Sequence, residues 1–320
     1  MLKRIIGNEG PKASLSAALR EGRLAHSVLL LGEEGCGVGF AARCLAADYL
    51  YPQGGPAAEA LVAGQASQAV TEKDGSGRIL TGQVREVITA RGDGAGGELR
   101  VGAVRALRAE MFNTALTGER RAAIFYGAQD MNQNSANALL KILEEPPENV
   151  LLLLTASSAA AVLPTIRSRC AQYTFSPVSE EECQDYLLRQ DPACENAALL
   201  SAAFGGCIGR AARAAFEPAE AACFDAALNL ARATAQGREY EMLVLLAAYE
   251  KDRPGAQKLL EDYISLCDAA LNHGGLEGLS PQAAGRAIPL AGAAQKALAG
   301  YVNTKLVLTN LGIRLAGCAS

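Results

Sequence analysis

The chain lacks tryptophan and contains only two histidines, His26 and His273, among its 320 residues. With so few imidazoles, we expect neither a histidine-based metal cluster nor a histidine catalytic dyad. Nine cysteines are scattered along the chain, an odd number with no C-x-x-C pair. Such spacing is typical of a reduced, cytosolic protein and not of a disulfide framework.

Long apolar runs and a net basic charge are also missing. The longest uncharged apolar stretches fall far short of the roughly 20 residues that span a bilayer, and the opening MLKRIIGNEG has no apolar signal segment. Thirty basic residues against 34 acidic ones give a net charge of −4, so no overall basic field attracts nucleic acid. We therefore expect a cytoplasmic protein without a membrane partner, whose DNA contacts are local or made through other subunits.

Helices and strands alternate up to about residue 176, which predicts an α/β domain with a parallel sheet. A Gly-rich region over 52–97 looks irregular apart from one strand candidate at 84–90. From Ser179 onward only amphipathic helical segments follow. The predicted strands are 28–31, 84–90, 122–126 and 150–154, and the predicted helices of the α/β part lie near 11–21, 38–50 and 101–116.

The stretch from Ser135 to Cys170 says most about the fold and the function of the chain. Its period fits a helix that Pro146 and Pro147 end, because proline cannot continue a helix. The continuous apolar run 150–154 then indicates a strand covered on both faces, and an exposed Ser-Arg-Cys triplet follows. Taken alone, an exposed arginine such as Arg169 is usually a solvated side chain. The helix is predicted to bury Ala138, Leu139, Ile142 and Leu143 and to expose Lys141, Glu144 and Glu145.

NALLKILEEPP and the triplet Ser168-Arg169-Cys170 resemble the core of the bacterial DNA polymerase III clamp-loader subunits, members of the AAA+ family of ring-forming ATPases. The resemblance implies three domains: an AAA+ α/β domain over 1–176, a small helical lid over 177–216 and an all-α C-terminal collar over 217–320. It also implies that Arg169 acts in trans, as an arginine finger in the ATP site of an adjacent subunit. Ser168 and Cys170 would hold the turn that aims it.

A glycine loop follows the first strand where this family has its phosphate-binding loop. The pattern G-x-x-x-x-G-K-[ST] uses backbone amides and a lysine to hold phosphates and a hydroxyl to hold Mg²⁺. Gly32 and Gly37 keep the glycine spacing, but Val38 takes the lysine position and Gly39 the hydroxyl position. Glu33 and Glu34 add like charge beside any phosphate, so we expect no ATP here.

Other family positions are altered or ambiguous. By the resemblance, Gly127 and Ala128 stand where Walker B carries Asp-Glu. Thr155 matches sensor 1, and its alternative is a hydrogen-bonding residue at a strand end. Arg210 matches sensor 2, and its alternative is a helix-start arginine in a domain contact. Only Cys44 stands near a ligand position of the family's four-cysteine zinc module, so we predict no zinc.

A kept Ser-Arg-Cys finger beside a decayed nucleotide site resembles the delta-prime branch of the family, its stator. The resemblance implies a subunit without activity of its own, in a heteropentamer with gamma/tau and delta subunits. It would serve the DNA polymerase III holoenzyme, a DNA-directed DNA polymerase, and meet the sliding clamp and primer-template DNA through the complex. Two alternatives stay open: an ATP-binding motor subunit similar to gamma/tau, and a structural scaffold with an idle finger.

Overall fold

The structure is a computed structural model that describes residues 1–64, 67–71, 78–80, 84–92, 98–114, 120–300 and 302–319. The chain divides into two compact units, Met1–Pro177 and Val178–Ser320. The predicted lid and collar both fall in the second unit, and their separation at residue 216 stays a prediction. None of the helices in the described ranges has the length and apolarity to cross a membrane.

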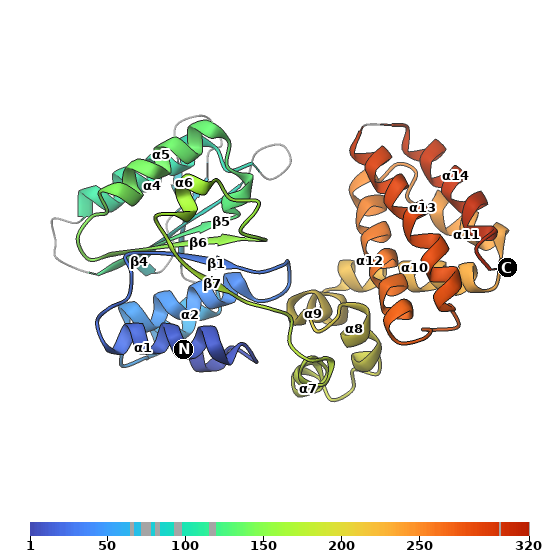
Figure 1. Cartoon of the computed structure of the whole chain (residues 1–320), viewed down its shortest axis with the longest axis horizontal. Helices are drawn as coiled ribbons and strands as arrows, with labels where there is room; N and C mark the ends of the chain where they lie inside the picture. Colours follow the sequence, from blue (N-terminus) through green and yellow to red (C-terminus); the bar gives the residue numbers. More distant parts are fainter. Residues whose placement is uncertain are drawn as a thin grey trace. The chain divides into compact units, whose positions relative to one another are not determined.

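The first unit is a seven-stranded sheet between two layers of helices (Figure 1). The strand order is β3-β2-β4-β5-β6-β1-β7, and every neighbouring pair is parallel except β2 with β3. The predicted parallel α/β sheet is confirmed. The strands are β1 Ser27–Leu31, β2 Ser67–Thr71, β3 Arg78–Leu80, β4 Val84–Arg91, β5 Arg121–Tyr126, β6 Val150–Ala156 and β7 Ala171–Thr174.

Helices cover both faces of this sheet, as Figure 1 shows: α1 and α2 lie on one face, and α4, α5 and α6 on the other. The helices are α1 Glu9–Arg20, α2 Val38–Leu50, α3 Pro56–Val62, α4 Val101–Thr114, α5 Gln133–Glu144 and α6 Pro164–Arg167, with short 3₁₀ turns at Leu2–Arg4 and Ala128–Asp130. Helix α3 and strands β2 and β3 correct the expectation that 52–97 is irregular apart from one strand. Pro56 occupies the first turn of α3, where its missing N–H costs no hydrogen bond.

Two-sided burial explains the apolar strand runs. In β6, Leu152 and Leu154 pack toward α5, whereas Leu151 and Leu153 pack toward α2. Successive side chains of a strand point to opposite faces, so each face of β6 buries its own set. The same alternation holds in β1 and β5, which flank β6 in the middle of the sheet.

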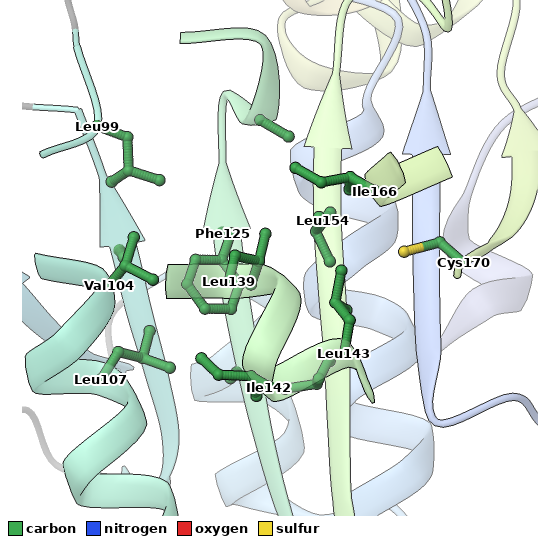
Figure 2. Close-up of a cluster of buried hydrophobic side chains, with 14 of the residues drawn as sticks. Leu99, Val104, Leu107, Phe125, Leu139, Ile142, Leu143, Leu154, Ile166 and Cys170 are labelled. Carbon is green, nitrogen blue, oxygen red and sulfur yellow. The ribbon is translucent and has the colours of Figure 1, made fainter. Parts of the chain in front are cut away.

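Helix α5 matches the predicted pattern in most respects. The Asn132 side chain caps its start by accepting the Ser135 N–H at 2.9 Å. Leu139, Ile142 and Leu143 are buried, Lys141, Glu144 and Glu145 are exposed, and the helix ends at Glu144, just before the two prolines. Ala138 is half-buried and packs at the edge of this core. Figure 2 shows Leu139, Ile142 and Leu143 among the side chains of the cluster over β5 and β6.

The second unit is helical throughout its described residues, as predicted. Helix α7 begins with a reciprocal capping box between Ser179 and Glu182. The helices are α7 Glu180–Gln190, α8 Ala197–Ala203, α9 Ile208–Phe216, α10 Pro218–Ala235, α11 Glu239–Ala247, α12 Arg253–Asn272, α13 Pro281–Ala299 and α14 Thr304–Ala316.

Leu139→Ala is expected to lower the free energy of unfolding of the first unit by about 2–5 kcal/mol, because it leaves a cavity under a fully buried side chain. Leu140→Ala, on the same helix, is the matched control: Leu140 is only half-buried, so it should lose clearly less. Urea unfolding followed by circular dichroism measures both. Equal losses for the two variants would contradict the assigned inward face of α5.

Candidate functional site

The Ser-Arg-Cys triplet forms the turn between α6 and β7. Pro164 sets the first residue of this one-turn helix. The Arg169 N–H donates to the Ile166 carbonyl at 3.1 Å, and the Cys170 N–H donates to the Arg167 carbonyl at 3.3 Å. The turn is therefore closed by backbone hydrogen bonds on both sides of Arg169.

Cys170 differs from the expectation that the whole triplet is exposed. Ser168 and Arg169 are exposed, but Cys170 is buried in the same cluster as Leu143, Leu154 and Ile166. Its sulfur points into that cluster in Figure 2. Burial raises the pKa of the Cys170 thiol to about 12, so the thiol stays protonated and serves as an apolar anchor. Strand β7 is next to β1, and this pairing turns Cys170 inward.

The Arg169 guanidinium contacts three acceptors of its own chain. Nη1 donates to the Thr165 carbonyl at 3.0 Å and to Ser168 Oγ at 3.4 Å. Nη2 donates to Glu144 Oε1 at 2.8 Å, forming an ion pair with the last residue of α5. Ser168 Oγ also donates to the Thr165 carbonyl at 3.1 Å, so the Ser168 hydroxyl takes part in the turn.

The glycine loop between β1 and α2 makes its turn on glycines, and Val38 and Gly39 begin the helix that follows. Gly35 and Gly37 have φ of +90° and +82°, which favour glycine. Gly32 lies so close to β7 that a Cβ there would stand 2.6 Å from the Phe175 carbonyl oxygen. Glu33 and Glu34 are exposed on the same loop. Gly32 is therefore required by backbone packing, independently of any nucleotide.

An aromatic ring lies against the first turn of α2. A Cβ placed on Gly39 would contact Tyr126 Cε1 at 3.4 Å, and Val38 and Tyr126 each pack against the edge of the core on this face. The Arg91 guanidinium lies over the Tyr126 ring, 5.0 Å from its centroid. Sequence reasoning did not single out Tyr126 or Arg91. Their pairing in register at the ends of β5 and β4 is visible only in the structure.

The residues predicted to stand at Walker B and sensor 1, Gly127, Ala128 and Thr155, lie together at the carboxyl ends of β5 and β6. Gly127 has φ of +79°, and a Cβ there would lie 2.5 Å from an Asp130 carboxylate oxygen, so this position favours glycine. The Gly127 N–H donates to Thr155 Oγ1 at 3.3 Å. Thr155 thus makes the strand-end hydrogen bond that was its alternative role. Ala128 is buried and carries no group for a metal or a water.

Arg210, the sensor 2 candidate, is engaged within the second unit. It lies in the first turn of α9 and donates from Nη2 to Asp262 Oδ1 at 3.3 Å and to Ser265 Oγ at 3.0 Å. Its guanidinium also stacks on Phe204, 4.6 Å from the ring centroid. Asp262 is almost fully buried and is shared with Lys258 Nζ at 3.0 Å. These bonds join α9 to α12 inside the second unit, so neither the sensor 2 role nor the domain-contact alternative is decided by them.

Cys44, the residue near a zinc-ligand position, lies on the buried face of α2. It is fully buried, and burial raises the pKa of its thiol to about 12. Within the described ranges, no three His, Cys, Asp or Glu side chains gather where they could hold a metal ion. The absence of zinc stays a prediction.

Known proteins resemble the chain in sequence. A family model described as "DNA polymerase III, delta subunit" matches residues 7–179, just over half of the chain. The DNA polymerase III subunit delta' of Bacillus subtilis is 28% identical over 184 residues, 58% of this chain and 52% of the relative. The gamma/tau subunit of Mycobacterium tuberculosis is 33% identical over 171 residues, 53% of this chain and 28% of the relative. The chain thus spans about half of the first of these relatives and less of the second.

A solved structure agrees in fold. A DNA polymerase III gamma subunit-related protein of Thermotoga maritima has a TM-score of 0.52 at 14% identity and covers 96% of this chain and 99% of that chain. The sequence matches place the chain among the subunits of DNA polymerase III, and the solved structure agrees with the parallel α/β sheet. Among these subunits, the chain belongs to the DNA polymerase III delta-subunit family, and the delta' relative confirms the predicted kinship with the delta-prime branch.

Cys170 is expected to resist alkylation in the native state. A pKa of about 12 against an ordinary value of 9.0 lowers its thiolate fraction at pH 8 roughly a thousandfold. Iodoacetamide labelling followed by peptide mass spectrometry should modify the half-exposed Cys194 well before Cys170. Unfolding in urea should abolish the difference. Equal native rates would contradict the inward orientation of Cys170.

The isolated chain is expected to bind Mg²⁺-ATP with a dissociation constant above about 1 mM. This corresponds to a binding free energy weaker than roughly −4 kcal/mol. The physical reason is the loss of the lysine and hydroxyl at Val38 and Gly39 and the Tyr126 ring beside them. Isothermal titration calorimetry should give no saturable heat. A micromolar dissociation constant would instead favour the motor-subunit alternative.

Proposed function

We propose that the chain is the delta-prime stator subunit of the DNA polymerase III clamp loader, which lends Arg169 to the ATP site of an adjacent gamma/tau subunit. The observation that carries the proposal is the turn after α6. It holds Arg169 exposed while Ile166 and Cys170, on either side of it, are buried. A cation fixed in this way can stabilise the charge that develops on a transferred γ-phosphate.

In this proposal the chain has no activity of its own. Its nucleotide loop lacks the lysine and the hydroxyl of a phosphate-binding site, and Gly127 and Ala128 supply no carboxylate. We infer that it holds neither ATP nor zinc and acts as a non-catalytic component of a DNA-directed DNA polymerase. In this proposal the chain is cytoplasmic and forms a heteropentamer with gamma/tau and delta. That complex would contact the sliding clamp and primer-template DNA.

The helical second unit supports a role in permanent assembly. Large apolar side chains are exposed on two of its helices: Tyr240 and Val244 on α11, and Leu306 and Ile313 on α14. Exposed apolar residues of this size are characteristic of protein interfaces when they form a patch. We propose that they contact the other subunits.

A gamma/tau-like motor subunit is the second candidate. It is favoured by the 33% identity to a gamma/tau subunit, above the 28% to the Bacillus delta', and by the retained turn of the glycine loop. A scaffold with an idle finger is the third, favoured by the ion pair that Arg169 makes with Glu144.

Arg169→Ala is expected to leave assembly intact and to reduce clamp- and DNA-stimulated ATP hydrolysis of the reconstituted loader strongly. Arginine fingers increase the hydrolysis rate about 10³–10⁵-fold in well-studied GTPases. ATP hydrolysis at the gamma/tau site that Arg169 contacts should therefore nearly stop. Single-turnover hydrolysis resolves that site from the others, and size-exclusion chromatography checks assembly.

Arg189→Ala is the matched control for this experiment. Arg189 is exposed and pairs with one carboxylate, Asp185, at 3.8 Å, but it lies on α7. It should leave hydrolysis unchanged. An intact rate with Arg169→Ala would support the scaffold, and failure of the wild-type chain to assemble would refute the clamp-loader proposal.

A further inference from the structure

The ion pair between Glu144 and Arg169 places an anion of the same chain on the proposed finger. Glu144 ends α5, inside the EEPP segment, and Arg169 follows α6, so 25 positions of sequence separate them. The carboxylate accepts from Nη2 at 2.8 Å, the distance of a charge-assisted hydrogen bond. A phosphate oxygen of a neighbouring subunit would compete for the same kind of donor.

The three contacts of Arg169 divide between its two terminal nitrogens. Nη1 is held by the Thr165 carbonyl and by Ser168 Oγ, both in the turn that carries the arginine. Nη2 is held by Glu144, from a different element. Loss of the Glu144 contact therefore leaves the guanidinium attached to its own turn through Nη1. An arriving anion has to replace only one partner.

The energetics allow that exchange. The Arg169 side chain is 37% exposed and that of Glu144 51% exposed. Solvent-exposed ion pairs of this kind contribute little, since water and salt screen them. A phosphate carries more charge than a carboxylate and offers several acceptor oxygens to the planar guanidinium.

We propose that Glu144 is an internal counter-ion that holds Arg169 until a phosphate of an adjacent subunit displaces it. This inference rests on the proposed function, because it needs Arg169 to act on a partner's nucleotide. Glu144 then opposes finger engagement and sets a threshold for it. The opposite role, in which Glu144 holds Arg169 in its working geometry, predicts an effect of opposite sign.

Glu144→Gln tests the sign of the effect. Glutamine keeps the length of the side chain and an acceptor oxygen but removes the charge. In the reconstituted loader with clamp and primer-template, kcat/KM for ATP should rise about two- to fivefold, the range that release of an exposed ion pair permits. The gain should shrink as salt is added, because screening weakens the wild-type pair.

Two controls make the test specific. Glu145→Gln removes the neighbouring exposed carboxylate, for which the described structure gives no ion pair with Arg169, and it should change nothing. In the Arg169→Ala background, Glu144→Gln should also have no effect, since a double-mutant cycle removes any contribution that does not pass through Arg169.

The outcomes separate the two proposals. A lower or unchanged kcat/KM for Glu144→Gln, with a strong loss for Arg169→Ala, would overturn the counter-ion and leave the finger standing. An increase that persists without Arg169 would also overturn it. If Arg169→Ala itself has no effect, the finger fails, and the counter-ion proposal falls with it.

Discussion

Burial on both sides of one exposed arginine is the constraint on which the candidate site depends. Ile166 and Cys170 are drawn into the core over β6, and the chain between them has only enough length for a closed turn. Arg169 therefore cannot turn inward without pulling an apolar neighbour into water. The free energy of core packing, which no surface contact could match, is what fixes the position of a flexible cationic side chain.

The glycine loop between β1 and α2 owes its shape to its own backbone packing. Its backbone conformations are set by glycines with positive φ and by the ends of three adjoining strands, and none of these depends on a bound phosphate. Val38 and Gly39 stand at the positions that the resemblance assigns to the lysine and the hydroxyl. Tyr126 and Arg91 add an aromatic and cationic pair beside them, which makes this end of the sheet a packed surface.

Much of the fold was predictable, because period and burial are local properties of sequence. The 3.6-residue spacing of Leu139, Ile142 and Leu143 and the apolar run of β6 identified α5 and β6, the helix and the strand that precede the turn of Arg169. Helix α3 was missed because proline and glycine mark loops and helix starts alike. The prediction that the whole Ser-Arg-Cys triplet is exposed was wrong for Cys170. The pairing of β7 with β1 decides which side chain of the turn enters the core.

Contacts between distant positions could not be predicted in this way. The pair Glu144–Arg169, the ring of Tyr126 against Gly39 and the bonds from Arg210 to Asp262 each join residues that no periodicity relates. Each depends on how two elements pack, and packing is a property of the whole sheet or bundle. The sequence pattern identified Arg169 and Arg210 as notable arginines, but it held no sign of what each contacts.

The close approach of Gly32 to the Phe175 carbonyl affects how decayed members of such families are interpreted. Any side chain at position 32 would push β7 away from the loop, so selection for a folded domain alone preserves this glycine. A first glycine in such a loop is therefore not, taken alone, a sign of nucleotide binding. When the nucleotide sites of paralogues are compared, the informative positions are those whose residue is not required by backbone packing. The first glycine of the loop is not one of them.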